Sequence, residues 1–108
     1  MTNKLDAFDK TLTLVFAGDI LSTNADTLRQ EAVEIIESPA VEGAWHTLSL
    51  DMRSAKMVDS VGLNLIVSLI KLAKTRNAKV VGHIANPSVQ RALTFTRLNT
   101  QMDLVMAA

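Results

Sequence analysis

The stretch WHTLSLDMRSAKMVDSVGLNLIVSLIKLAKTRNAKVVGHI, residues 45–84, contains two strand patterns separated by one helix pattern. Apolar side chains alternate along residues 45–52 and form a compact run along residues 78–84, which is typical of strands. Between them, apolar side chains recur at helical spacing over residues 61–76. A strand, a helix and a strand of these lengths predict a βαβ unit with two parallel strands and a helix packed on the sheet.

Strand patterns continue toward the N-terminus. In residues 11–16 (TLTLVF), apolar side chains alternate with threonines, which predicts a half-buried strand. Residues 4–9 (KLDAFD) are the candidate for an antiparallel neighbour of this strand, with a turn at Asp9-Lys10. The sheet is therefore expected to be mixed.

Capping residues indicate where the two remaining helices begin. One helix is predicted from the apolar spacing in residues 25–36, and Pro39 marks its end. Its cap is expected from one of three polar loop residues, Ser22, Thr23 or Asn24. The other helix begins at Asn86-Pro87, because asparagine is a favoured cap and proline is favoured in the first helical turn. Residues 102–106 (MDLVM) are the candidate for a last short strand.

These elements predict the fold class: a single α/β domain over residues 1–108, with a four-to-five-stranded mixed sheet backed by helices. A chain of this length can bury one core but not two. Three methionines, Met52, Met57 and Met102, are expected to fill gaps in that core.

Composition excludes several classes of protein. Eleven basic residues balance eleven acidic ones, so direct binding to nucleic acid is not expected. The longest apolar stretch, residues 63–73, contains Asn64, Ser68 and Lys71 and cannot span a bilayer, so membrane insertion is not expected either. The chain has no cysteine for a disulfide, and residues 1–10 do not resemble a signal peptide. A cytoplasmic location is expected.

Asp59 and Ser60 stand where the helix over residues 61–76 begins. At 100° per residue, Ser60 falls about 40° from Asn64, on the polar stripe of the helix, while Asp59 falls roughly 140° away. Asp59 is therefore expected to turn inward and cap the helix, and Ser60 to face solvent. Because Asp and Ser are both favoured helix caps, the pair alone is also explained by capping without any further role.

The start of this helix offers a place for a phosphate on Ser60, since free N–H groups and a partial positive charge meet there. Gly62 has no Cβ and is expected to leave the backbone beside the hydroxyl open to an approaching partner. Val61 and Val67 lie on either side of the polar stripe and are expected to form an apolar fringe beside the serine.

Residues 48–99 resemble the STAS domain of anti-sigma factor antagonists, and the similarity extends from about Leu14 to Val105. Its most specific part is the motif VDSVGL at residues 58–63, preceded by Asp51, where the family has D followed by DSSGL or DSTGL. The segment FAGDI, residues 16–20, resembles the family's GEL or GDL segment. The chain departs from the family at three positions: Leu21 replaces a frequent Asp, Val61 a Ser or Thr, and Asn64 a common Gly.

The resemblance implies a partner-switching regulator that is neither an enzyme nor bound to a cofactor or metal. The dephosphorylated protein would bind a serine kinase of the GHKL type that also acts as an anti-sigma factor. Phosphorylation of Ser60 would end that binding, and a cognate phosphatase would restore it. Asp59 and Gly62 would support the phosphorylation site. The partner-binding residues implied are Asp19, Val61, Asn64 and Val67.

An alternative lies within the same fold. Some STAS modules serve as docking subunits of lipid-transport ATPases or as parts of other signalling scaffolds, where the serine at the helix start contributes to an interface and not to a switch.

Other chemistries find less support in the sequence. A receiver domain would carry phosphate on Asp51 or Asp59, but the acidic pair and the late lysine that it needs are missing. A serine hydrolase built on Ser60 would need a G-x-S-x-G turn and a histidine base. His46 and His83 stand in no recognisable catalytic or metal-binding context.

Overall fold

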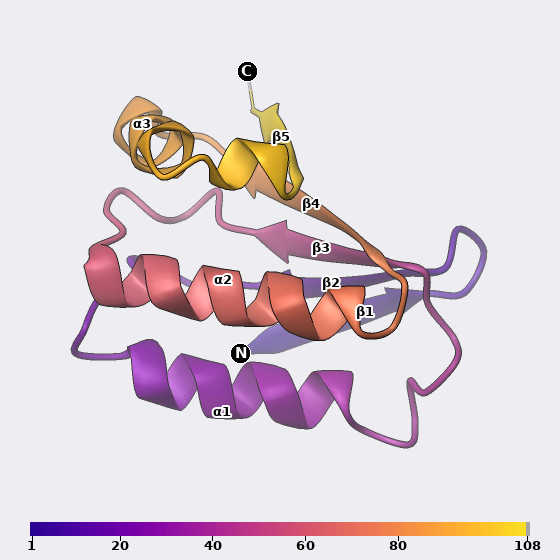
Figure 1. Ribbon diagram of the computed structural model, residues 1–108. Helices are drawn as coiled ribbons and strands as arrows, with labels where there is room; N and C mark the ends of the chain where they lie inside the picture. The colour runs from indigo at the N-terminus through magenta and orange to yellow at the C-terminus, as the bar shows by residue number, and fades with distance from the viewer. Residues whose placement is uncertain (108) are drawn as a thin grey trace.

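A five-stranded mixed sheet forms the centre of the fold in the computed structural model, which describes residues 1–107 (Figure 1). The strands follow one another across the sheet in chain order. They are β1 (Thr2–Asp6), β2 (Thr11–Val15), β3 (Thr47–Asp51), β4 (Lys79–Ile84) and β5 (Asp103–Met106). β1 pairs with β2 antiparallel, and all other neighbours are parallel. The predicted mixed sheet is confirmed.

Three helices pack on one side of this sheet (Figure 1). They are α1 (Ala25–Ile36), α2 (Ser60–Lys74) and α3 (Pro87–Phe95), and a short 3₁₀ turn, η1 (Leu98–Thr100), leads from α3 into β5. α1 and α2 lie side by side over the middle of the sheet, while α3 and η1 lie beside β5. The predicted βαβ unit is confirmed as β3–α2–β4, in which β3 and β4 are parallel.

The core lies between the sheet and the helices, and the alternation of each strand explains it. In β2 and β3, Leu12 pairs in register with Leu48 and Leu14 with Leu50, and all four side chains are buried toward the helices. The face of α2 that packs on them is the one predicted from the helical wheel, with Leu65, Ile66, Leu69 and Ala73 buried.

The opposite face of the sheet, here called the open face, carries mainly polar side chains. Register places Thr13, Ser49 and Val81 in one row across β2, β3 and β4. Asp51 and His83 are neighbours in the next row. Thr13, Asp51 and His83 are each half-buried, whereas Ser49 is buried.

The first hairpin differs from the prediction. β1 spans Thr2–Asp6 and not residues 4–9, and the turn begins at Ala7. The reason is local: the Asp6 carboxylate accepts hydrogen bonds from the N–H groups of Phe8 and Asp9, which favours a turn directly after the strand.

The helix caps follow the sequence in two of three cases. Asn86 caps α3 as predicted, because its side chain accepts a hydrogen bond from the Ser88 N–H at 2.8 Å. Asn24 precedes α1 but makes no side-chain cap. Its Oδ1 accepts instead from the Leu21 N–H and its Nδ2 donates to the Asp19 carbonyl, so this side chain orders the loop before α1. α2 begins one residue earlier than predicted, and Asp59 is its cap.

Candidate functional site

Asp59 fixes the start of α2 and ties it to a distant loop. Its Oδ1 accepts a hydrogen bond from the Gly62 N–H at 2.8 Å, which is the bond of an N-cap residue. Its Oδ2 accepts another from the Ser22 N–H at 2.8 Å, across 37 residues of sequence. These hydrogen bonds, the one from Gly62 first, lower the pKa of Asp59 below its ordinary value. Asp59 is therefore an ionised acceptor. It caps α2 as predicted, but the residue is only half-buried and its carboxylate is not withdrawn from solvent.

The loops that follow β2 and β3 are joined by a second set of hydrogen bonds. Ile20 and Val58 form a parallel bridge, in which the Ile20 N–H donates to the Met57 carbonyl and the Asp59 N–H donates to the Ile20 carbonyl, both at 3.2 Å. Asp19 Oδ1 accepts from the N–H groups of Lys56 and Met57 at 2.7 and 3.1 Å. Each loop thus contributes one carboxylate to the backbone of the other.

This arrangement gives Asp19 a role inside the protein. The resemblance implied that Asp19 contacts a partner, but its side chain is half-buried and its Oδ1 is engaged with the neighbouring loop. A direct contact between Asp19 and a partner stays a prediction. Its observed contribution is to hold the loop before α2 in place.

The prediction that Gly62 leaves the backbone open to a partner is wrong. Gly62 is buried, and a Cβ built on it would lie 2.2 Å from the Ile20 carbonyl oxygen and 2.9 Å from Val58 Cγ1. The glycine is required because the first turn of α2 packs directly on the backbone of the loop after β2. Sequence reasoning missed this contact since it depends on a loop more than 40 residues away.

Ser60, the first residue of α2, lies on an exposed surface. Asn64 is exposed one turn along the helix, and between them Val61 is 37% exposed. Val67 is half-buried beyond them. The structure therefore brings these four predicted residues onto one side of α2, with Asp59 and Gly62 beneath.

Met57, which precedes Ser60 closely in the chain, is exposed, although it was predicted to fill the core. It is 59% exposed, whereas Met52 and Met102 are buried as predicted. The cause is the short parallel bridge at Val58: in extended chain, successive side chains point to opposite sides, so buried Val58 leaves Met57 outside. We define the Ser60 surface as Met57, Ser60, Val61, Asn64 and Val67.

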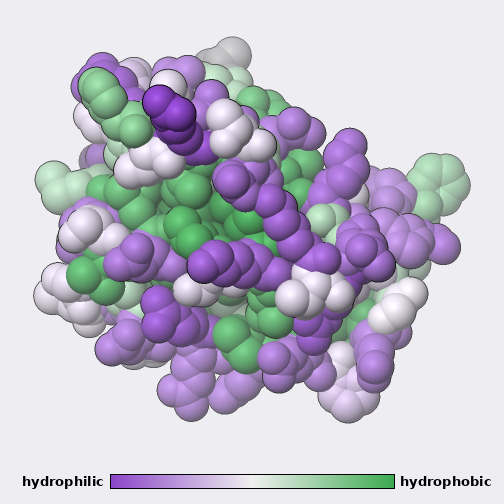
Figure 2. Space-filling model, viewed as in Figure 1, coloured by the Kyte–Doolittle hydropathy of each residue, from purple (hydrophilic) through white to green (hydrophobic). Residues whose placement is uncertain are grey.

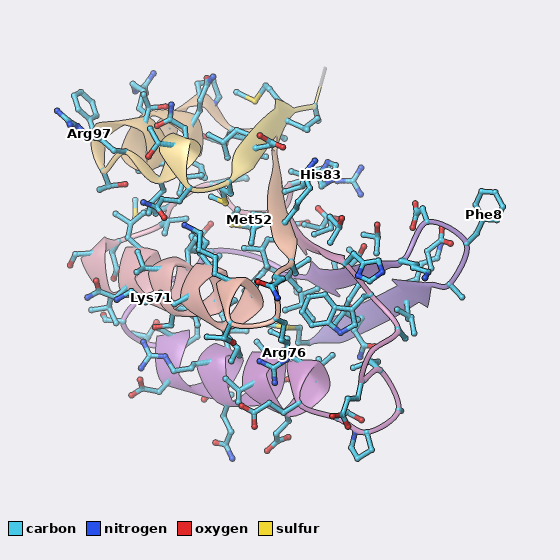
Figure 3. All side chains as sticks on the ribbon, turned by 45° about the vertical axis from the view of Figure 1, so that its right-hand side comes forward. Phe8, Met52, Lys71, Arg76, His83 and Arg97 are labelled. Atoms are coloured by element: carbon cyan, nitrogen blue, oxygen red, sulfur yellow. The ribbon has the colours of Figure 1, made fainter. Side chains whose placement is uncertain are left out.

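A hollow continues the Ser60 surface along α2. It has a volume of about 290 Å³, and Val67 and Ile70 of α2 line it together with Leu98 of η1. Figure 2 shows apolar side chains in this region, between α2 and the segment of α3. Lys71 and Arg97 stand at its rim and extend from α2 and from the junction of α3 and η1 (Figure 3). The Ser60 surface thus borders an apolar hollow with a basic rim.

The alternative phosphate acceptors are engaged elsewhere. Asp51 forms a two-point ion pair with Arg53, with distances of 2.9 and 2.8 Å, and this hydrogen bonding lowers the pKa of Asp51. Both oxygens of Asp59 are bound to backbone N–H groups. Among residues 1–107, no three histidine or acidic side chains gather in a way that would hold a metal ion. No helix in the same range is both long and apolar enough to cross a membrane.

A profile of the STAS domain family matches residues 4–106. The chain belongs to the STAS domain family. A search of curated protein sequences found no match to it.

Several solved structures share this fold. A putative anti-sigma factor antagonist from Thermotoga maritima, tm1081, superposes with a TM-score of 0.79 at 18% identity, covering 99% of this chain and 86% of its own. The anti-sigma factor antagonist SpoIIAA in its unphosphorylated form gives 0.73 at 16% identity, covering 99% and 89%. A sulfate transporter family protein from Wolinella succinogenes gives 0.69 at 13% identity, covering 84% and 70%. At these identities the likeness establishes the fold, and the majority of these structures are of anti-sigma factor antagonists.

Proposed function

We propose that this STAS protein is a partner-switching regulator of the anti-sigma factor antagonist type, controlled by phosphorylation of Ser60. In its dephosphorylated form it binds a serine kinase of the GHKL type that also acts as an anti-sigma factor. Phosphorylation of Ser60 ends the binding, and a cognate phosphatase restores it. The protein acts in the cytoplasm, by binding and not by catalysis, and its output is transcription.

The observation that carries this proposal is the position of Ser60. Its side chain is exposed at the first position of α2, beside exposed Met57 and Val61, on backbone that Asp59 and Gly62 hold in place. A kinase needs an accessible hydroxyl, and a regulated interface needs a modification site among its contacts. Ser60 has the accessible hydroxyl, and the proposed interface includes it among its contacts.

The charge of the helix start supports the same conclusion. A phosphate adds roughly −1.5 to −2 charge, which is tolerated or stabilising at the positive end of a helix. The fold should therefore remain intact after phosphorylation. A partner packed over Val61 and Val67 would instead have to accommodate an uncompensated dianion in its interface, which is costly.

The structural relatives favour the switch over the docking alternative. The anti-sigma factor antagonist tm1081 is matched more closely than the sulfate transporter family protein, by TM-score and by the share of both chains covered. SpoIIAA has been determined in both an unphosphorylated and a phosphorylated form, so this structural relative does carry a phosphate in one of its states.

The proposal is tested by mass spectrometry of the protein isolated from its native host. A phosphate should be found on Ser60, and Ser60→Ala should abolish it. Ser54, an exposed serine in the loop that leads to α2, is the matched control: Ser54→Ala should leave the modification unchanged. Phosphate on neither serine, under all growth conditions in which the protein is present, would refute the switch and leave docking as the better account.

A further inference from the structure

The outer edge of β5 carries unpaired backbone groups on an apolar strand. β5 is the last strand of the sheet and pairs only with β4 among residues 1–107 (Figure 1). Its sequence is Asp103-Leu104-Val105-Met106, in which Val105 is 45% and Met106 38% exposed. Natural sheets protect such edges with short strands, charged side chains, proline, bulges or a covering segment. β5 is short, at 4 residues, and carries Asp103 at its start, but it has no lysine or proline and its last three residues are apolar. The opposite edge strand, β1, carries Lys4.

The direction of each backbone group in β5 follows from one hydrogen bond. The Ala107 N–H donates to the Ile84 carbonyl of β4 at 2.7 Å. Backbone groups of successive residues in a strand point to opposite edges, so those of Val105 also face β4. The N–H and C=O groups of Leu104 and Met106 therefore face outward, where a further strand would pair with them.

We propose that β5 is a homodimer interface, in which β5 pairs antiparallel with β5 of a second copy around a two-fold axis at Val105. In an antiparallel pair, two residues that lie directly opposite each other have their side chains on the same face of the sheet. A two-fold axis perpendicular to the sheet must therefore pass between two copies of the same residue, and not between two successive residues. At Val105, each Leu104 lies opposite Met106 of the other copy, and each of these two pairs exchanges both N–H···O bonds. The two Val105 side chains meet on the open face.

The composition of the strand favours a second copy as the occupant. With the axis at Val105, apolar side chains face each other: Val105 lies opposite Val105, and Leu104 opposite Met106. Asp103 then lies opposite Ala107 of the other copy. An axis at Leu104 would instead set the Asp103 carboxylate against Val105. The resulting sheet is continuous, with all helices on one face, and each outer edge is a β1 strand that carries Lys4 and resists further addition.

This interface is independent of the proposed switch. β5 contributes no residue to the Ser60 surface, which lies at the start of α2. Dimerisation and phosphorylation can therefore be tested separately, and the failure of one does not affect the other.

Cysteine cross-linking tests the register, since the chain has no cysteine of its own. Two non-hydrogen-bonded residues directly opposite have Cα atoms about 4.5 Å apart, which is within the range of a disulfide. Val105→Cys treated with copper phenanthroline should form a covalent dimer within minutes at micromolar concentration. Phe8→Cys is the matched control, because Phe8 is 99% exposed at the tip of the β1–β2 turn and points away from the domain (Figure 3).

Cross-linking of Val105→Cys well above that of Phe8→Cys supports the proposal, and equal or lower cross-linking overturns it. In a second measurement, sedimentation equilibrium should show dimers of the wild type that weaken about tenfold in Val105→Asp, which sets like charges opposite each other. Circular dichroism should show that this variant remains folded. A wild type that stays monomeric at all concentrations would also overturn the proposal.

Discussion

Substituting Gly62 by alanine tests the contact that holds α2 on the loop after β2. The new Cβ would lie 2.2 Å from the Ile20 carbonyl oxygen, whereas ordinary contacts begin at 3.4 Å, so the two backbones would have to separate by about 1 Å. Both hydrogen bonds of the Ile20–Val58 bridge are already 3.2 Å long. A movement of this size breaks them, since a hydrogen bond is lost beyond about 3.5 Å.

The expected loss of stability combines three effects. Forcing an atom into a packed site costs about 1–3 kcal/mol. Each backbone hydrogen bond lost adds about 0.5–1.5 kcal/mol, and alanine returns up to about 1 kcal/mol through its higher helix propensity. The free energy of unfolding of Gly62→Ala should therefore fall by about 1–6 kcal/mol, with about 3 kcal/mol near the middle of that range. At that middle value, the melting temperature of a domain of this size should fall by roughly 10–20 °C.

Urea denaturation and thermal melting, followed by circular dichroism, measure this effect. Gly18→Ala is the matched control from the same loop, because a Cβ on Gly18 would meet no atom within 4 Å. This variant should be as stable as the wild type or slightly more stable, since alanine restricts the unfolded chain. If Gly62→Ala were as stable as Gly18→Ala, the close approach of α2 to Ile20 would be refuted.

Three further substitutions probe the hydrogen bonds around the site, each measured by urea denaturation. Asp59→Asn keeps one acceptor but loses the ionised carboxylate. Because the pKa of Asp59 is lowered in the folded state, the stabilisation by its carboxylate is complete above about pH 4 and is lost as the pH falls below that value. The wild type and Asp59→Asn should therefore converge in stability as the pH falls. A constant difference down to pH 2 would contradict this. Asp19→Ala leaves two N–H groups without their acceptor and should cost about 1–3 kcal/mol, whereas Asp19→Asn should cost much less; equal losses would refute the role of Oδ1. Asn86→Ala removes the cap of α3 and should cost about 1 kcal/mol, while Asn86→Asp, which caps equally well, should not.

Local periodicity was sufficient to predict the βαβ unit and the orientation of α2. The wheel that placed Ser60 on the solvent side depends only on the helical repeat and on the apolar face of residues 61–76, and burial of that face agrees with it. Asp59, which the wheel placed inside, is only half-buried. The cap at Asp59 was predictable for the same reason, because a cap bonds to its own helix.

The contacts between the two loops could not be predicted from the sequence. The Asp59–Ser22 and Asp19–Lys56 hydrogen bonds join residues 37 positions apart, and no local pattern marks such a pair. The same nonlocal packing explains the two errors at the site. Gly62 is a close-contact glycine only because Ile20 lies against it, and Met57 is exposed only because Val58 pairs with Ile20.

The central claim, that phosphate on Ser60 controls partner binding, is tested most directly by one affinity measurement. Calorimetry would compare the wild type, its Ser60-phosphorylated form and Ser60→Ala against a purified GHKL-type serine kinase from the same organism. The wild type and Ser60→Ala should bind alike. The phosphorylated form should bind more weakly by roughly 2–5 kcal/mol, at least about thirtyfold, with an unchanged circular dichroism spectrum. Equal affinity of all three forms would contradict the account and leave Ser60 as an ordinary first residue of α2.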